Sequence, residues 1–337
     1  MTQELDTRCR DLIDALSLGA ASDVYEITAL TGGVASDIAS LRVGEAHYCA
    51  KFALPKLKVA ADWHAPVHRN AAEYAWLQVA AELVPHSAVR LFGRSEQAHG
   101  FVMEFVSGDD IYLLKTALLA GEMPKQEVSA IGDMVGRIQA ASSQSDFDRT
   151  AFHNRDDFRA LRIEPYLSYT AAAHPEVAEA LNTLADELYS STAVLVHGDV
   201  SPKNILIRAG SPLLLDAECA TVGDASFDPS FFLNHLILKA IHLPQTRAAL
   251  FAAVGTFWQA YSPHVCWEPL AGLEARICRL TAALMLARID GKSPVEYLTE
   301  TQRTQIREIA LSRIKQPVAT LAELLDAVDT HLKDLEA

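Results

Sequence analysis

Short apolar runs separated by polar turns dominate the first third of the chain. Residues 25–30, 37–42 and 46–53 are rich in apolar or β-branched side chains, a pattern that is typical of strands. Residues 31–33 read Thr-Gly-Gly between the first two runs and predict a hairpin turn. The chain is therefore expected to begin with a small, mostly antiparallel sheet.

One helix is predicted inside this strand-rich region. Residues 69–83 repeat apolar side chains at helical spacing, so that these side chains share one face. Residues 89–92 and 101–106 then predict two further strands. The first part of the chain thus contains about five strands, with the helix inserted after the third.

The pattern becomes mostly helical after residue 107. Within this part, residues 194–228 form a non-helical island with two short apolar runs, 205–207 and 213–215. We interpret residues 1–106 as one lobe and residues 107–337 as another, which is a two-lobe α+β arrangement with a ligand expected between the lobes. The predicted helices cover residues 112–120, 125–141, 176–189, 246–261, 270–289, 301–314 and 319–332.

Composition narrows the class of protein. The chain has 337 residues, of which 50% are hydrophobic and 21% charged, so it is expected to be globular and long enough for two domains. Lys and Arg number 29 against 43 Asp and Glu, a formal net charge of −14. An acidic surface repels phosphate backbones and anionic lipid, so neither nucleic acid nor membrane is expected as a partner. A local basic pocket and the oligomeric state are left open.

The cysteines and the absence of long apolar runs favour a cytoplasmic location. The chain has five cysteines, none of them in a C-x-x-C pair, so neither a disulfide framework nor a zinc site is expected. The first residues do not read as a signal peptide, and no apolar run approaches the roughly 20 residues that span a bilayer. We therefore expect a soluble protein of a reducing compartment.

The candidate chemistry lies in the island. A His-Gly-Asp sequence ends at Asp199, Asn204 follows five residues later, and Asp216 and Glu218 follow the second apolar run. Carboxylate and amide oxygens are the ligands that Mg²⁺ prefers, and one carboxylate can orient an attacking hydroxyl. A simpler interpretation is a set of loop carboxylates and strand caps. The density of polar residues between two apolar runs favours catalysis.

This island resembles the catalytic loop and metal segment of the aminoglycoside phosphotransferase and choline kinase superfamily. The Asp-x-Glu form at Asp216 and Glu218 is most similar to the methylthioribose kinase branch. The resemblance implies a bilobal protein-kinase-like fold, ATP as donor, Mg²⁺ as cofactor and a small hydroxylated acceptor. It further implies that Asp199 takes the proton of the acceptor hydroxyl and that Asn204, Asp216 and Glu218 hold the metal.

The resemblance also assigns residues in the first lobe. Lys51, at the end of an apolar run, matches the phosphate-binding lysine of the third strand, and Glu73 on the following helix is its expected partner. Gly32 and Gly33 occupy the position of the phosphate-covering loop, although an ordinary hairpin turn competes with that interpretation. Glu104 and Val106 are the remaining nucleotide-binding candidates, and they would contact adenine through their main chains.

Asp228 and residues 288–294 of the second lobe are candidates for structural roles. Asp228 is expected to brace the catalytic loop by hydrogen bonds. Residues 288–294 either face the cleft and bind an anionic or polar acceptor, or form a helix C-cap with Gly291 in the left-handed conformation; we favour the cap. The predicted function is an ATP-dependent small-molecule kinase that transfers the γ-phosphoryl group to a hydroxyl. The alternative is a non-catalytic nucleotide-binding protein of the same fold, and a kinase acting on protein targets ranks last.

Overall fold

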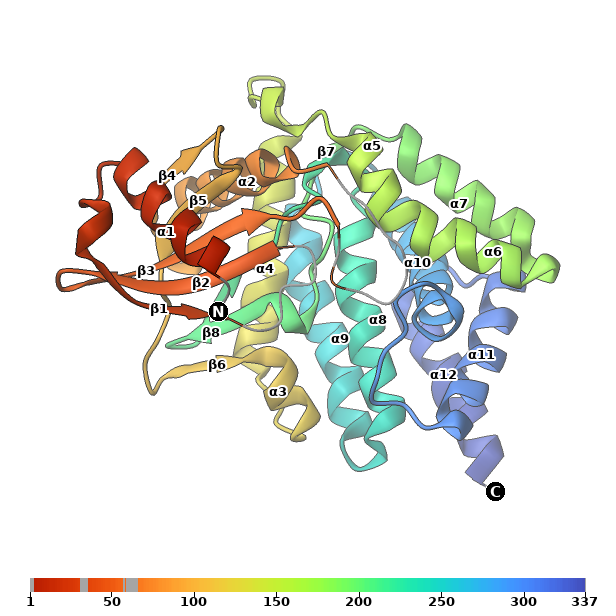
Figure 1. The fold of residues 1–337 in the computed structure, drawn as a ribbon. Helices are drawn as coiled ribbons and strands as arrows, with labels where there is room; N and C mark the ends of the chain where they lie inside the picture. The colour runs from red at the N-terminus through yellow and green to blue at the C-terminus, as the bar shows by residue number, and fades with distance from the viewer. Residues whose placement is uncertain (1–2, 31–35, 57, 59–65, 337) are drawn as a thin grey trace.

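A five-stranded antiparallel sheet forms the N-terminal lobe (Figure 1). The computed structural model describes residues 3–30, 36–56, 58 and 66–336, so the predicted glycines Gly32 and Gly33 lie outside the described residues. All neighbouring strands pair antiparallel, which confirms the predicted sheet and its first hairpin. In sheet order the strands are β1 (Val24–Ala29), β2 (Ser36–Val43), β3 (Ala46–Ala53), β5 (Gly100–Glu104) and β4 (Leu91–Ser95).

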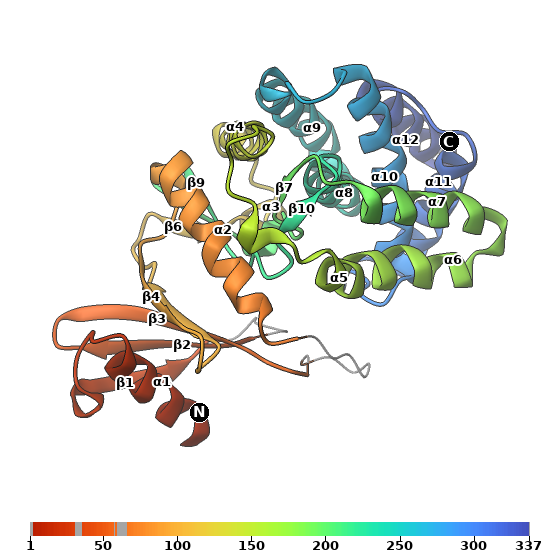
Figure 2. The same ribbon diagram turned by 90° about the horizontal axis from the view of Figure 1, so that it is seen from above.

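One helix packs on each face of this sheet (Figure 2). Helix α1 (Gln3–Ala15) buries Cys9, Leu12 and Ile13 in one cluster with Ala50 and Phe52 of β3. Helix α2 (Arg69–Leu83) lies on the opposite face, towards the C-terminal helices. Because side chains alternate along a strand, the neighbours of Ala50 and Phe52 in β3 point towards α2. This alternation directs Lys51 away from α1.

The C-terminal lobe is mostly helical, as predicted, with two small sheets. Strands β7 (Val194–Val196) and β10 (Thr221–Gly223) pair antiparallel, and β6 (Ile111–Leu113), β8 (Ile205–Arg208) and β9 (Ser211–Leu214) form the second sheet. The helices are α3 (Leu114–Leu119), α4 (Lys125–Ser142), α5 (Arg155–Phe158), the π-helix η4 (Arg159–Ser168), α6 (Tyr169–Ala173), α7 (Ala178–Ser190), α8 (Phe227–His242), α9 (Arg247–Tyr261), α10 (Leu270–Asp290), α11 (Glu300–Lys315) and α12 (Leu321–Glu336).

Four parts of this architecture differ from the sequence predictions. Helix α1 was not predicted, and the predicted helix 112–120 begins as strand β6. The helical run from α5 to α6 was also missed; it contains Pro165, a residue that disfavours helix interiors. Helix α8 was missed because it is buried on every side, so that its sequence carries no polar face and no amphipathic repeat.

The segment after α10 also corrects a prediction. Gly291 has φ −85°, so the predicted left-handed cap is wrong. A side chain at this position would collide with the carbonyl oxygen of Ala287 and would approach that of Pro165. Glycine is therefore required here because the backbone at the end of α10 leaves no space for a Cβ, and η4 lies close by. Across the described chain, none of the helices is both long and apolar enough to cross a bilayer.

Candidate active site

The catalytic-loop candidate lies between β7 and β8, and the carboxylate of Asp228 holds it in place by hydrogen bonds. The backbone N–H of His197 donates to Asp228 Oδ2 at 2.8 Å, and that of Gly198 donates to Oδ1 at 2.9 Å. These bonds confirm the predicted bracing role. Gly198 has φ +84°, and a Cβ there would lie 2.7 Å from Cys219 Cβ, so only glycine fits this turn.

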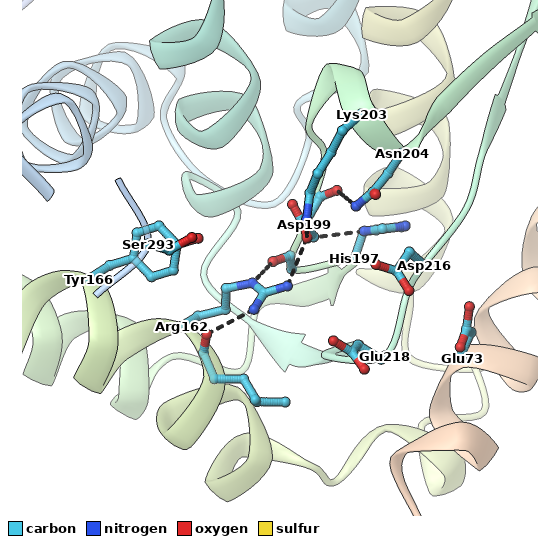
Figure 3. A network of polar contacts seen from close by, with 12 residues as sticks. Glu73, Arg162, Tyr166, His197, Asp199, Lys203, Asn204, Asp216, Glu218 and Ser293 are labelled. Carbon is cyan, nitrogen blue, oxygen red and sulfur yellow. Dashed lines mark hydrogen bonds and ion pairs between the residues drawn. The ribbon is translucent and has the colours of Figure 1, made fainter. Parts of the chain in front are cut away.

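Asp199 is buried and ionised beside two cations (Figure 3). Arg162 Nη2 donates to Asp199 Oδ2 at 3.0 Å, and Lys203 Nζ lies 3.2 Å from the same oxygen. Burial raises the pKa of the Asp199 carboxyl, but Lys203 and Arg162 outweigh burial and hold it well below its usual range. Oδ1 is buried without a hydrogen-bond partner within the described chain, so this oxygen remains available to a ligand.

His197 links the catalytic loop to α2. Its Nδ1 accepts a hydrogen bond of 3.1 Å from the backbone N–H of Asp199, and its ring meets Trp76 edge to face at 4.6 Å between centroids. Burial lowers the pKa of His197 to about 3, so the ring is neutral at physiological pH. A neutral ring with an accepting Nδ1 therefore fixes the backbone at Asp199.

Lys51 joins the two lobes. Its Nζ lies 2.6 Å from Glu73 Oε1, and the same ammonium also contacts Asp216 Oδ1. Lys51 and Glu73 are 2% and 3% exposed, so this is a buried pair. Burial alone lowers the pKa of Lys51, but Asp216 and Glu73 raise it above its ordinary value, and the ammonium stays charged. The structure thus brings the predicted lysine to its predicted partner, while their action on phosphate stays a prediction.

Asn204 and Asp216 are the next two predicted metal ligands. Asn204 Nδ2 donates to the carbonyl oxygen of Asp199 at 3.1 Å, which leaves the amide oxygen for another partner. Asp216 follows β9 with φ +71°, a left-handed conformation that is uncommon and costs energy for a non-glycine residue. The chain is therefore held in an unfavourable conformation where the carboxylate of Asp216 meets Lys51.

Glu218, a predicted metal ligand, also forms an ion pair that the sequence did not predict. Its Oε2 accepts a hydrogen bond of 2.9 Å from Arg69 Nε, and both side chains are buried. The same guanidinium donates to the carbonyl oxygens of Pro66 and Leu54 at 2.7 and 2.9 Å. Glu218 therefore anchors α2 and the segment before it, and only its second oxygen is left as a candidate ligand.

The nucleotide-edge candidates lie where β5 leaves the sheet. The Glu104 carboxylate pairs with Arg208 at 2.7 Å, and the backbone N–H of Glu104 donates to the carbonyl oxygen of Arg90 at 2.9 Å. Val106 follows the strand, and its N–H makes no backbone hydrogen bond to the remainder of the described chain. Val106 therefore keeps a main-chain donor for a ligand, whereas the N–H of Glu104 is already used.

The oxygen donors fit a magnesium ion that is shared with phosphate. Nowhere in the described ranges do three or more His, Cys, Asp or Glu side chains gather as a complete metal cage. Mg²⁺ usually binds proteins through one or two carboxylates and completes its shell with water and phosphate oxygens. Asp216, the amide oxygen of Asn204 and the second oxygen of Glu218 supply a set of that kind.

Three cationic residues of the site were missed by sequence reasoning. Lys203 stands inside the quoted motif, four residues after Asp199, and that spacing was the available signal. Arg162 lies on η4, in a helical run that was not predicted, and only tertiary folding brings it to the loop. Arg69 opens α2, and its partner Glu218 is 149 residues away in sequence. No short-range pattern connects such pairs.

Comparisons with known proteins agree with this geometry. The model of the phosphotransferase enzyme family matches residues 26–273. A methylthioribose kinase of Bacillus cereus (strain G9842) is 24% identical over 249 residues, and the match covers 65% of this chain and 62% of that relative, so the chain spans less than two thirds of its length.

Solved structures show the same fold at low sequence identity. Choline kinase LicA from Streptococcus pneumoniae is 16% identical, with 93% of this chain and 99% of that chain covered and a TM-score of 0.52. Amicoumacin kinase hAmiN, solved in complex with AMP-PNP, Ca²⁺ and Ami, is 14% identical, with 96% and 100% covered and a TM-score of 0.57. These similarities confirm the predicted bilobal kinase-like fold.

Proposed function

The chain belongs to the phosphotransferase enzyme family, and from this premise we propose that it is an ATP-dependent small-molecule kinase. It would transfer the γ-phosphoryl group of ATP to a hydroxyl of a small acceptor. The observation that carries the proposal is the position of Lys51, which contacts Glu73 of the N-terminal lobe and Asp216 of the C-terminal lobe. Phosphoryl transfer requires a cation and a metal-binding carboxylate at one point between the lobes.

Each residue then has a defined task. Asp199 orients the acceptor hydroxyl and accepts its proton while the new oxygen–phosphorus bond forms and the bond to ADP breaks. Lys51 neutralises phosphate charge, and Glu73 holds the lysine in place. Mg²⁺ bound at Asp216, Asn204 and Glu218 would offset the charge of the triphosphate. Positioning and charge neutralisation supply most of the catalysis in such reactions.

The boundary between the two proposed functional lobes would lie at Val106. We propose residues 1–106 as the nucleotide-binding lobe, with Gly32 and Gly33 over the phosphates and main-chain groups of Glu104 and Val106 near the adenine. Residues 107–337 would hold the metal and the acceptor. The main-chain N–H of Val106 supports this assignment, because it makes no backbone hydrogen bond within the described chain.

The variant Asp199→Asn tests the proposal. ADP formation would be measured with Mg·ATP and a panel of methylthioribose, choline, an aminoglycoside and an extract of the source cells. We expect acceptor-dependent ADP formation to fall by roughly 10²-fold or more, because the proton acceptor is lost. The dissociation constant for ATP should stay within about threefold of wild type, since asparagine keeps the shape of the side chain.

Asp186→Asn is the matched control, because Asp186 is exposed on α7. It should behave as wild type in both measurements. Full activity of Asp199→Asn would refute the assignment of Asp199. ATP binding without turnover of any acceptor would instead favour a non-catalytic nucleotide-binding protein.

A further inference from the structure

A second group of polar side chains lies among the helices beside Asp199. We call it the basic cluster. It comprises Tyr166 of η4, His235 and Lys239 of α8, Arg288 of α10, and Tyr297 in the segment that follows α10. The reaction described above uses none of these residues.

The basic cluster is continuous with the catalytic loop. Arg288 Nη1 donates to Tyr166 Oη at 3.2 Å, and Tyr166 lies four residues from Arg162, the partner of Asp199. The Tyr166 ring also packs against Phe231 at 5.5 Å, and Phe231 packs against His235 at 5.7 Å between ring centroids. Figure 3 shows Asp199 between Glu73 on one side and Tyr166 with Ser293 on the other.

Lys239 is a buried cation without a carboxylate partner. It is 1% exposed, and its Nζ lies 5.0 Å from the centre of the Tyr297 ring. No ion pair or hydrogen bond to this ammonium is found in the part of the chain that the structure describes. Glu296 is the carboxylate that acts on Lys239, and it already pairs with Lys115. The charge of Lys239 is therefore not compensated by the protein.

Arg288 and its neighbours carry further unused hydrogen-bonding groups. Arg288 is 9% exposed; its Nη1 bonds Tyr166 Oη and Ser293, while its Nε has no partner among the described residues. His235 Nδ1 and Tyr297 Oη are likewise buried without a partner there. Two cations and three unused polar atoms thus converge on one region beside the catalytic aspartate.

Burial of a cation without a carboxylate partner is costly, and groups with strongly shifted pKa values cluster at functional sites. Burial, Lys115 and Arg288 lower the pKa of Lys239 to about 7, and burial with Lys239 and Arg288 holds the pKa of His235 well below its usual value. Burial is the largest cause of both shifts, and the neighbouring cations lower the two pKa values further. An anion bound there would relieve the repulsion between the cations.

We propose that the acceptor carries an anionic group, a carboxylate or a phosphate, which Arg288 and Lys239 bind while its hydroxyl faces Asp199. This inference rests on the proposed kinase function and names the class of its acceptor. His235 and Tyr297 would supply neutral hydrogen bonds to the same molecule. Like charge would disfavour cationic acceptors at this position, whatever the net charge of the surface.

Four probes that share one polyol chain test the charge of the acceptor. They are sorbitol, gluconate, sorbitol 6-phosphate and N-methylglucamine, which are neutral, carboxylated, phosphorylated and cationic. Dissociation constants would be measured by calorimetry with Mg·AMP-PNP present, so that the nucleotide site is occupied. We expect gluconate or sorbitol 6-phosphate to bind about tenfold tighter than sorbitol, the gain of one charge-assisted hydrogen bond, and N-methylglucamine to bind most weakly.

The tighter of the two anions identifies carboxylate or phosphate as the group that is bound. Equal binding of all four probes, no binding by any of them, or a preference for N-methylglucamine would overturn the proposal. Lys239→Met and Arg288→Gln should each reduce the preference for the anion to about twofold or less. Lys315→Met removes an exposed lysine at the end of α11 and should leave the preference unchanged.

Two variants keep the test decisive if one of them fails to fold, as judged by its melting curve. Retention of the full anion preference in either folded variant contradicts the proposal. A separate AMP-PNP titration distinguishes this failure from that of the kinase assignment. If the protein binds AMP-PNP but prefers sorbitol, only the proposal of an anionic acceptor is refuted. If the protein prefers an anion but does not bind AMP-PNP, the kinase assignment is refuted and the anion site is retained.

Discussion

Asp199 keeps its charge in a buried position because Arg162 and Lys203 reach the same carboxylate oxygen. Its pKa is low, so the carboxylate is a weak base that is ionised at every physiological pH. In the proposed reaction such a group would contribute chiefly by orienting the acceptor hydroxyl and receiving its proton late, which suits a loose phosphoryl-transfer transition state. The neutral ring of His197 fixes the backbone that carries it.

The low pKa of His197 makes a prediction about stability. The unfolded chain protonates this histidine near its ordinary pKa of about 6.5, whereas burial lowers the folded value to about 3. The stability that depends on the neutral ring is therefore complete above about pH 6.5 and is lost as the pH falls towards 3. Between about pH 6 and about pH 4, wild type should lose roughly 1.4 kcal/mol more per pH unit than His197→Asn.

Urea unfolding at several pH values measures this difference. Asparagine retains an acceptor for the N–H of Asp199 and does not titrate. His86→Asn, at an exposed position after α2, should follow the wild-type pH dependence. Parallel pH profiles for wild type and His197→Asn would show that the ring titrates normally in the folded protein.

Single residues differ in how much of their role the sequence discloses. Lys51 was found because a strand pattern and a family motif coincide at that position, and Asp199 and Asn204 because they share one short motif. Arg162 could not be found, since its contact with Asp199 spans 37 residues and depends on how η4 packs. The ion pair of Glu218 with Arg69 has the same long-range origin.

Helix α2 is the element that connects the sheet to the catalytic loop. Arg69 bonds Glu218, Glu73 bonds Lys51, and Trp76 packs on His197. These positions are three or four residues apart, so they lie along one face of the helix. A small rotation of α2 would therefore disturb the lysine, the metal segment and the catalytic loop together.

Glu73→Gln tests the role of this face. Glutamine keeps a hydrogen-bond acceptor but removes the charge opposite Lys51, so kcat/KM for ATP should fall by roughly tenfold to a hundredfold. Glu82→Gln changes an exposed glutamate near the far end of the same helix and should have wild-type kinetics. Steady-state kinetics of both variants give the comparison, and equal values would remove Glu73 from the mechanism.

Elements were predictable where local pattern and final environment agree. The bounds of β3 and α2 matched the prediction: β3 is a short run that is mostly buried, and α2 has one buried face. Helix α8 was not predicted, because nearly all of its residues are buried and it has no polar face. Strand β6 replaced the start of a predicted helix because it pairs with β8, which lies about ninety residues later in the chain.

The whole molecule buries several cations although its net charge is negative. The chain carries a net charge of −14, yet Lys51, Arg162, Lys239 and Arg288 are all buried around the catalytic loop and the basic cluster. Buried carboxylates such as Glu73 and Asp199 accompany the first two of these cations, whereas the basic cluster would favour an anionic group of the proposed acceptor. Lys51 comes from the sheet of the N-terminal lobe, whereas Arg162, Lys239 and Arg288 come from helices of the C-terminal lobe.

Transfer of a labelled phosphoryl group tests the central claim most directly. Wild type and Asp199→Asn would be incubated with Mg²⁺, an extract of the source cells and ATP carrying ¹⁸O in its γ-phosphoryl group, and the products would be weighed by mass spectrometry. The account predicts that one small molecule gains the labelled phosphoryl group with wild type and not with the variant. The same labelled product from both proteins, or none from a wild type that binds ATP, would contradict it.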